Sequence, residues 1–162
     1  MTALVANPAD AQFYRPCAGV MLVDGAGRVW VGERHDVPGA WQMPQGGIDV
    51  GEEPRAAALR ELAEETRVTN VAFLAEAPDW LKYELPPELL RRAWEGRWRG
   101  QMQKWFAFRH LGDESEIDVA GVGTPEFGRW KWVELDELPS LIVDFKRPVY
   151  EALVEIFRPH IA

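Results

Sequence analysis

The sequence is poor in cysteine and in basic residues. Its one cysteine, Cys17, excludes an internal disulfide, fits a reducing compartment, and is expected to pack in the core. The 18 Lys and Arg are outnumbered by 26 Asp and Glu, which gives a net charge of −8. Proteins that hold nucleic acid along its backbone need a broad basic surface, so DNA is not expected as a partner. A small basic patch could still recognise the end of a nucleic acid.

Long apolar runs and a secretion signal are also missing. No apolar run approaches the roughly 20 residues that cross a membrane, and residues 1–12 lack a charged segment followed by an apolar one. The sequence therefore predicts a cytoplasmic protein without a membrane partner. Residues 1–12 are interpreted as a flexible leader and residues 13–162 as a single domain, expected to be a monomer.

Hydrophobic alternation and turn residues predict an α+β domain. A hairpin is expected from strands at 17–23 and 28–34, which flank the turn sequence 24–27. Further strands are expected at 41–45, 69–77, 80–85, 103–110 and 130–133. Helices are expected at 54–66 and 146–157, with a short helix at 87–93. Strands on both sides of a central helix, with a second helix at the end, indicate a layered αβα arrangement.

The helix expected at residues 54–66 carries much negative charge on one side. Pro54 suits its first turn, because the amide that proline lacks would have no partner there. At 100° per residue, the side expected to face the core contains Leu59, Leu62, Ala63 and Thr66. The opposite side is expected to carry three glutamates, Glu61, Glu64 and Glu65.

These glutamates are expected to be neutralised by bound positive charge. Like charges three or four residues apart repel by roughly 0.2–0.5 kcal/mol per pair, and carboxylates late in a helix face the negative end of its dipole. Arg60 can reach Glu64 on the helix and Glu52 in the preceding loop, but one guanidinium does not satisfy four carboxylates. A hard cation such as Mg²⁺ does, because it prefers carboxylate, water and phosphate oxygens. A solvated acidic helix face is the alternative for three glutamates alone.

The spacing around this helix resembles the Nudix box, Gly-x5-Glu-x7-Arg-Glu-U-x-Glu-Glu-x-Gly-U, where U is aliphatic. The matching positions are Gly46, Glu52, Arg60, Glu61, Leu62, Glu64, Glu65 and Val68. The chain is thus similar to the Nudix hydrolases. Arg67 departs from the pattern, because the box has a glycine there that takes a left-handed conformation at the helix end. A different helix exit is therefore expected, with no metal ligand lost.

Other stretches resemble one branch of this superfamily, the bacterial RNA pyrophosphohydrolases, which are close kin of the dinucleoside polyphosphate hydrolases. The similar stretches are YRP at 14–16, WQMPQGGI at 41–48, WLKYELP at 80–86, GQMQKWF at 100–106, TPEF at 124–127 and FKRPVY at 145–150. The resemblance implies the Nudix fold, a mixed β-sheet sandwiched between helices. It also implies Mg²⁺ or Mn²⁺ as cofactor, with two to three ions when substrate is bound.

The resemblance also assigns roles to single residues. It implies that the metal ligands are Glu61, Glu64, Glu65, Glu126 and the backbone carbonyl of Gly46. It implies that the phosphate-binding side chains are Arg15, Arg34 and Lys146. Phe145 and Arg34 are implied to sandwich the first base of the substrate.

Further residues are candidates for substrate contact, but they could equally be ordinary surface residues. Gln45 and Gln103 are candidates for holding waters or phosphate oxygens, and Lys104 for binding phosphate, with surface positions as the alternative. A basic aromatic group is a candidate RNA contact or else a solvated loop, and it contains Arg91, Arg92, Trp94, Arg97, Trp98 and Arg99.

The implied chemistry is metal-assisted hydrolysis of a phosphoanhydride. Glu65 or Glu64 is the candidate general base, and Arg60 with Glu52 is expected to pin the loop to the helix. The first functional interpretation is removal of pyrophosphate from 5′-triphosphorylated RNA, which leaves a 5′-monophosphate and promotes RNA decay. The second is hydrolysis of dinucleoside polyphosphates. The third, a catalytically inactive nucleotide-binding module, would be expected to have lost Arg60 or a glutamate of the box, and the sequence retains them all.

Overall fold

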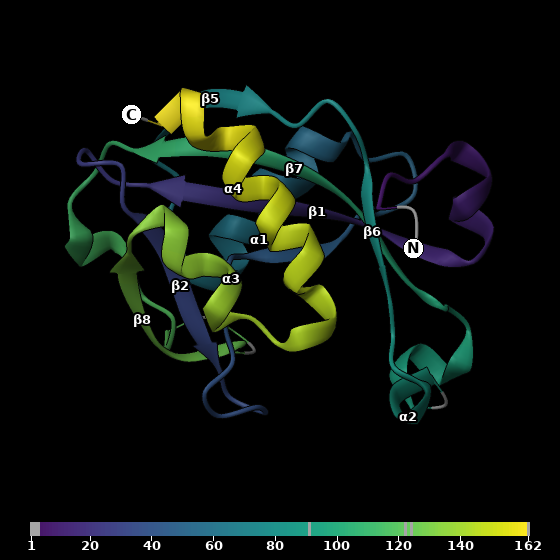
Figure 1. Cartoon of the computed structure of the whole chain (residues 1–162). Helices are drawn as coiled ribbons and strands as arrows, with labels where there is room; N and C mark the ends of the chain where they lie inside the picture. Colours follow the sequence, from purple (N-terminus) through teal and green to yellow (C-terminus); the bar gives the residue numbers. More distant parts are fainter. Residues whose placement is uncertain (1–3, 91, 122, 124, 162) are drawn as a thin grey trace.

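The structure is a computed structural model that describes residues 4–90, 92–121, 123 and 125–161. In these residues eight strands form one mixed sheet, whose central path runs β3-β2-β1-β7-β5 (Figure 1). β1 (Tyr14–Val23) and β7 (Gly100–His110) pair in parallel along the middle. The other strands pair antiparallel and are β2 (Val29–Arg34), β3 (Trp41–Gln42), β4 (Gln45–Gly47), β5 (Val71–Glu76), β6 (Leu81–Glu84) and β8 (Phe127–Val133). Off the central path, β4 pairs with β1, β6 with β7, and β8 with β2.

Two long helices cover opposite faces of this sheet. α1 (Pro54–Thr66) packs Leu62 into a core cluster with Phe106. α4 (Arg147–Ile161) packs Phe157 into a second cluster on the other face. Figure 1 shows α4 in front of the sheet and α1 behind it. The predicted αβα sandwich is therefore confirmed.

Short helices connect these elements. They are η1 (Pro8–Gln12), α2 (Pro87–Leu90), η2 (Ala93–Gly96), η3 (Glu114–Glu116), η4 (Leu135–Glu137), α3 (Leu138–Leu141) and η5 (Asp144–Lys146). Several were not predicted, because a helix of one turn is too short to show a periodic pattern. Among the described residues, none of the helices has the length and apolar character needed to cross a membrane.

Most predicted elements are confirmed with shifted ends. The strand expected at 41–45 is divided into β3 and β4, because Pro44 has no amide hydrogen to donate to a ladder. The last helix begins at Arg147, so Lys146 belongs to the preceding turn η5. Cys17 is fully buried in β1, as expected.

Residues 4–12 differ from the expectation of a loose segment. The backbone N–H of Lys82 donates to the carbonyl of Leu4 at 2.8 Å, and the N–H of Ala6 donates to the carbonyl of Trp80 at 2.8 Å. The free edge of β6 offers these backbone partners, which the sequence of the segment alone does not reveal. The division of the chain at residue 13 stays a prediction.

The centre of the sheet has little spare volume. Residues 17–23 are buried, which is typical of a parallel strand covered on both faces. The indole of Trp105 on β7 lies against Gly19 on β1, and a Cβ on Gly19 would come within 2.5 Å of the ring. Glycine is needed here because the indole occupies the space beside it.

Replacing Gly19 with alanine is therefore expected to destabilise the fold. Overpacking of a dense core costs about 1–3 kcal/mol of unfolding free energy. Urea denaturation of Gly19→Ala and Gly25→Ala measures this cost. Gly25 is the control, because no described atom outside residues 24–26 lies within 4 Å of its Cβ position. Equal denaturation midpoints for the two variants would contradict the packing described.

Candidate active site

The three glutamates of α1 lie at different depths. The side chain of Glu64 is 57% exposed and that of Glu61 is 15% exposed, whereas Glu65 as a residue is only 4% exposed. The prediction that all three project from the side opposite the core is therefore wrong for Glu65. Its position follows from the helix phase, because α1 turns Leu62, Glu65 and Thr66 toward the sheet. The predicted core positions Leu59 and Ala63 are only partly buried.

The end of α1 keeps the conformation expected for the glycine of the box. Arg67 has φ of 66°, which is left-handed, and its N–H donates to the carbonyl of Ala63 at 2.9 Å. The expectation of a different helix exit is thus wrong. A non-glycine residue costs roughly 1 kcal/mol or more in this conformation. The Arg67 side chain extends to the carbonyl of Gly121 at 3.3 Å and lines the same cavity as the glutamates.

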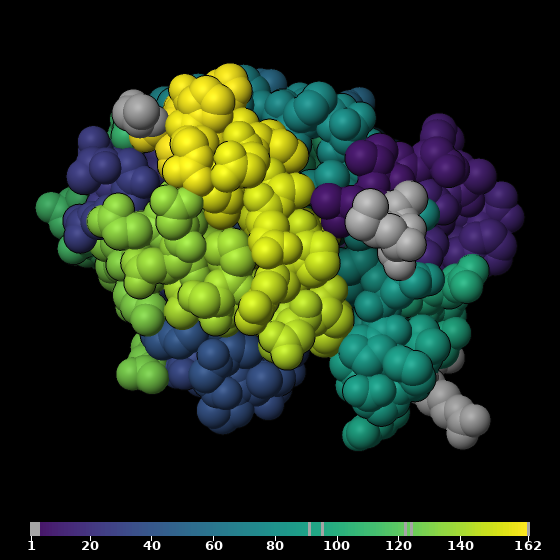
Figure 2. All heavy atoms as spheres, in the orientation of Figure 1, coloured from purple at the N-terminus to yellow at the C-terminus, as the bar shows by residue number. Residues whose placement is uncertain are grey.

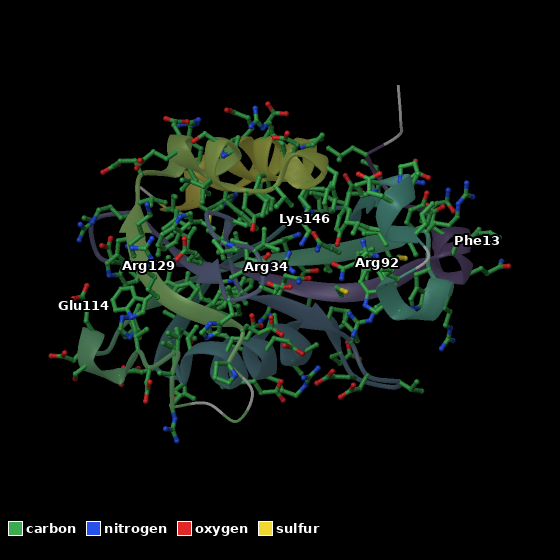
Figure 3. All side chains as sticks on the ribbon, turned by 90° about the horizontal axis from the view of Figure 1, so that it is seen from below. Phe13, Arg34, Arg92, Glu114, Arg129 and Lys146 are labelled. Carbon is green, nitrogen blue, oxygen red and sulfur yellow. The ribbon has the colours of Figure 1, made fainter. Side chains whose placement is uncertain are left out.

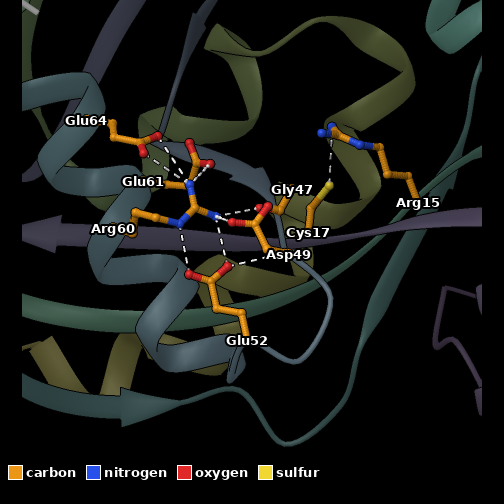
Figure 4. Close-up of polar contacts among 8 residues, drawn as sticks. All are labelled: Arg15, Cys17, Gly47, Asp49, Glu52, Arg60, Glu61 and Glu64. Carbon is orange, nitrogen blue, oxygen red and sulfur yellow. Dashed lines mark hydrogen bonds and ion pairs between the residues drawn. The ribbon is translucent and has the colours of Figure 1, made fainter.

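Arg60 is the centre of an ionic network that joins α1 to the loop before it (Figure 4). Its Nε and Nη2 donate to the two carboxylate oxygens of Glu52 at 2.8 and 2.9 Å. Its Nη1 donates to Glu61 at 2.8 Å and lies 3.2 Å from Glu64. Its Nη2 also donates to the carbonyl of Gly47 at 2.8 Å. The predicted pairs of Arg60 with Glu64 and with Glu52 are confirmed.

The two-point contact with Arg60 fixes the charge of Glu52. Hydrogen bonds from Arg60 and from the N–H of Asp49 hold the pKa of the Glu52 carboxyl down at about 2. Glu52 is therefore ionised across the physiological range and ties the loop before α1 to the helix. Arg60 also donates to the Glu61 carboxylate and to the backbone carbonyl of Gly47 in the loop.

Glu65 is a buried carboxylate without a partner. Neither of its oxygens has a hydrogen-bond partner in the part of the chain that the structure describes. Burial raises its pKa well above the usual range, and the neighbouring charges of Glu61 and Glu126 raise it further. Burial also raises the pKa of Glu61, although Arg60 opposes this shift. Buried polar groups normally have partners, so these oxygens are suited to bind a cation.

The donor set suits a hard divalent ion. Carboxylates and backbone carbonyls are the ligands that Mg²⁺ prefers, and Glu65 supplies two unpartnered oxygens. Within residues 4–90, 92–121, 123 and 125–161, no three His, Cys, Asp or Glu side chains converge as a closed metal site. A bound Mg²⁺ would therefore take waters and substrate phosphate oxygens as further ligands, as this ion usually does. The residues present fit such an ion.

Glycines allow charged groups to approach the strand β4. A Cβ on Gly46 would lie 2.1 Å from the carboxyl carbon of Glu61. A Cβ on Gly47 would lie 2.4 Å from the guanidinium of Arg15. The two glycines thus permit a carboxylate and a guanidinium to lie directly against adjacent residues of the same strand.

Two neighbouring cavities meet at this strand. The first has a volume of about 690 Å³ and is lined by residues that include Glu61, Glu64, Glu65 and Gly46. The second has a volume of about 410 Å³ and is lined by residues that include Arg34, Tyr83, Phe145 and Lys146. Both are lined by Arg15, Gln45 and Glu126. The site therefore has an acidic part and a basic, aromatic part that share three side chains.

The second cavity is lined by the basic side chains that the family resemblance assigned to phosphate binding, Arg15, Arg34 and Lys146. Figure 3 shows Arg34 and Lys146 between the two helix layers, with Arg92 farther along the same side. Lys146 is 9% exposed, and burial followed by the charge of Arg34 lowers its pKa to about 8. Arg34 is paired with Asp36 at 2.6 Å. An anionic ligand would stabilise the charged form of Lys146.

The chain also forms a third cavity beside the second. It has a volume of about 770 Å³ and lies between the start of α4 and β6, lined by Leu4, Lys82, Tyr83, Glu84, Phe145, Pro148, Glu151 and Ala152. Figure 2 shows the corresponding hollow between the yellow-green start of α4 and the teal segment with β6 and α2. Tyr83 and Phe145 line both cavities.

Some candidate residues lie outside these cavities. The Lys104 ammonium donates to the carbonyl of Ala77 and pairs with Glu76 at 3.2 Å, so the structure does not bring it to either cavity of the site. Gln103 is buried behind Gln45 and does not line them. Lys104 and Gln103 are also too buried for the alternative of surface positions.

Only part of the basic aromatic group reaches the second cavity. Arg92 and Trp94 line it, whereas Arg97, Trp98 and Arg99 do not. Arg91 and Thr124 lie outside the described residues.

Three of the residues with polar groups that line the second cavity were not predicted as site residues: Gln42, Tyr83 and Gln101. Tyr83 and Gln101 are cross-strand partners of β6 and β7. Glutamines at alternate positions of β7 were a usable signal, because they face the same side of the sheet. Gln42 gave no such signal.

Comparison with known proteins agrees with this geometry. The sequence matches the NUDIX domain over residues 13–153. It is 54% identical over 152 residues to an RNA pyrophosphohydrolase of Cereibacter sphaeroides, covering 92% of this chain and 93% of that protein. It is 55% identical over 155 residues to an RNA pyrophosphohydrolase of Mesorhizobium japonicum, covering 89% and 90%. The chain therefore belongs to the Nudix family.

Solved structures agree on the fold. The E. coli dihydroneopterin triphosphate pyrophosphohydrolase superposes with a TM-score of 0.68 at 22% identity, covering 88% of this chain and 98% of that one. This likeness concerns the fold alone. It confirms the predicted α+β Nudix architecture.

Proposed function

We propose that the protein is a hydrolase of phosphoanhydride bonds that removes pyrophosphate from 5′-triphosphorylated RNA and leaves a 5′-monophosphate. The observation that carries this proposal is the junction of the two cavities, where an acidic part meets a basic, aromatic part. A 5′-triphosphate would lie across the junction, with its nucleoside in the second cavity. The two RNA pyrophosphohydrolases described above, alike over at least 89% of this chain, support RNA as the substrate. The product would promote RNA decay.

The acidic cavity would hold divalent metal, which Nudix hydrolases generally use. We infer two to three Mg²⁺ or Mn²⁺ ions with substrate bound, which would neutralise the carboxylates and activate a water. The ligands proposed are Glu61, Glu64, Glu65, Glu126 and the carbonyl of Gly46.

Proton transfer is assigned to Glu65. Within the described residues its oxygens have no hydrogen-bond partner, so an oxygen that is not bound to metal is free to accept a proton from the attacking water. Glu64 is exposed and lies beside Arg60, which makes it the weaker candidate. The water oxygen bonds to the α-phosphorus, the bond from this phosphorus to the oxygen that bridges to the β-phosphorus breaks, and pyrophosphate leaves.

The basic cavity would bind the rest of the substrate. Arg15, Arg34 and Lys146 would hold phosphate oxygens, and Phe145 with Arg34 would sandwich the first base. We further infer that the protein works in the cytoplasm as a monomer and does not bind DNA along its length, which agrees with its net charge of −8.

Hydrolysis of dinucleoside polyphosphates is the second candidate function. The third cavity favours it, because it lies on the other side of Tyr83 and Phe145, which line both cavities, and would add room for another nucleoside. Both functions use the same carboxylates.

The test is product analysis with end-labelled triphosphorylated RNA, with Mg²⁺ and with excess chelator. Release of pyrophosphate with Mg²⁺, and its loss with chelator, are the expected results. Initial rates on diadenosine tetraphosphate under the same conditions discriminate the second function. A large preference for the dinucleotide, or retention of RNA as the triphosphate, would overturn the proposal.

Replacing Gly46 with alanine is expected to lower kcat at least tenfold while the fold is retained. The added methyl group would displace the Glu61 carboxylate, and small errors in the placement of reacting groups can cost about 10²-fold in rate. Gly123→Ala is the matched control, because Gly123 lines the same cavity and, among the described residues beyond its neighbours in sequence, no atom lies within 4 Å of its Cβ position. Equal kcat values for the two variants would show that the position of Glu61 does not limit turnover.

A further inference from the structure

We infer that Gln103 is a positioning residue which, anchored by Trp105, decides which atoms of Gln45 and Gln101 face the substrate cavities. The amide chain is the hydrogen-bonded series formed by the side chains of Trp105, Gln103, Gln101 and Gln45. This role rests on the proposed function, because it concerns how the same site holds phosphate. It replaces the expected direct contact between Gln103 and the substrate.

The amide chain begins at a group that can only donate. The indole Nε1 of Trp105 lies 3.0 Å from Oε1 of Gln103, and both residues are buried. An indole N–H has no acceptor function, so the atom opposite must be the amide oxygen. The orientation of the Gln103 amide thus follows from chemistry, although its oxygen and nitrogen are similar in size and shape.

The next two contacts follow from the first. The Gln103 nitrogen carries two hydrogens, and it donates to Oε1 of Gln101 at 2.8 Å and to Oε1 of Gln45 at 3.2 Å. A protonated amide nitrogen cannot accept, so both neighbours must turn their oxygens toward it. Gln103 then has all of its polar atoms bonded.

The amide chain ends in two hydrogen-bond donors, the amide nitrogens of Gln45 and Gln101. Gln45 lines both cavities and Gln101 lines the second. With their oxygens fixed inward, the amide nitrogens of these two residues are the atoms left for ligands. In the described part of the chain, the side-chain hydrogen bonds of these two residues are those that their oxygens accept.

The orientation matters because the proposed ligand is a polyphosphate. An amide N–H bonds a phosphate oxygen favourably, whereas an amide oxygen in the same place would repel it. Without the anchor, each glutamine could turn either end toward the cavity. Gln103 therefore acts on substrate through Gln45 and Gln101 and contacts no substrate itself.

The kinetic test compares methionine replacements, which keep the length of the side chain and remove its amide. Gln45→Met and Gln103→Met are each expected to raise KM for triphosphorylated RNA about tenfold, the loss of one hydrogen bond to a charged group, with a smaller change in kcat. In the Gln45→Met, Gln101→Met double variant, adding Gln103→Met is expected to change KM less than twofold. Gln12→Met, an exposed replacement in η1, is the control for surface glutamine loss.

A spectroscopic measurement on the unmodified protein avoids any effect of substitution on folding. With ¹⁵N-labelled protein, Mg²⁺ and inorganic pyrophosphate, the side-chain amide signals of Gln45 and Gln101 are expected to shift. The Gln103 amide and the Trp105 indole should shift less and exchange slowly with solvent.

Two results would overturn the role of Gln103. One is a full additional rise in KM when Gln103→Met is placed in the double variant. The other is a Gln103 amide signal that shifts more than those of Gln45 and Gln101, or no shift at these two. If the unmodified protein does not hydrolyse triphosphorylated RNA, the proposed function fails, and the pyrophosphate spectra decide the amide chain separately.

Discussion

The Glu65→Gln variant is expected to lose a factor of about 10² to 10⁴ in kcat, the range of general acid–base catalysis. Glutamine fills the same volume but does not accept the proton of the attacking water and carries no charge for a metal ion. The loss should lie mainly in kcat, because the basic cavity that binds the substrate is unchanged. Rates on end-labelled triphosphorylated RNA at saturating Mg²⁺ measure it.

The same variant should be more stable than the parent when metal is removed. Burial raises the pKa of Glu65 in the folded state, so folding disfavours its charged form. The parent therefore loses stability as pH rises above the unfolded pKa of a glutamate, about 4.3, and the glutamine variant does not. In chelator, the difference in Tm between variant and parent should be larger at pH 8 than at pH 5.

Glu53→Gln is the matched control for both measurements. Glu53 is an exposed carboxylate at the start of α1 and makes no capping hydrogen bond through its side chain. Its replacement should leave kcat and the pH dependence of Tm near those of the parent. Normal turnover by purified Glu65→Gln would exclude Glu65 as the base, and an unchanged Tm difference across pH would exclude its charge as a cost to the metal-free fold.

The Arg60→Ala variant should combine a large loss of activity with a loss of stability. Arg60 holds Glu52, Glu61 and the carbonyl of Gly47, so its removal leaves clustered carboxylates without a counter-charge. We expect kcat to fall about 10²-fold, since a misplaced catalytic group can cost this much. The expected loss of unfolding free energy is about 1–3 kcal/mol, between the values of exposed and buried ion pairs, because the Arg60 side chain is 28% exposed.

Two further variants show whether geometry or charge is responsible. Arg60→Lys keeps the charge but lacks the planar fork that bonds Glu52 at two points, so it should recover stability more than kcat. Arg55→Ala removes an arginine of the same helix that lies over the ring of Phe73, 3.7 Å from its centroid, and should leave kcat unchanged. If Arg60→Ala and Arg55→Ala gave the same kcat, the ionic network would have no part in arranging the site.

Local sequence patterns predicted the elements better than the depth of individual residues. The helix at 54–66 is confirmed at both ends, because proline at its start and a run of strong helix formers define it. The sequence did not predict correctly which face of this helix packs on the sheet. A helical wheel placed Glu65 opposite the core, and only the packing of Ala57, Ala58 and Leu62 on the sheet shows that Glu65 is buried.

Contacts between distant segments were the least predictable. The parallel pairing of β1 and β7 joins residues that lie more than 80 positions apart, and no local pattern encodes this register. It places Cys17 beside Gln103, and because β1 also pairs with β4, it brings Gln103 close to the strand that carries Gln45. The box could be identified from spacing alone, whereas Gln42, Tyr83 and Gln101 could be assigned to the site only after folding.

The placement of residues 4–12 has a consequence for how this molecule meets its neighbours. Strand β6 is bonded to β7 on one side, and on the other side Val5 forms a bridge with Leu81. An open strand border is a template to which another polypeptide can add, and proteins commonly block such borders. In this structure residues 4–6 cover the outer edge of β6. Removing them would expose unpaired backbone groups of this strand next to the third cavity and favour aggregation.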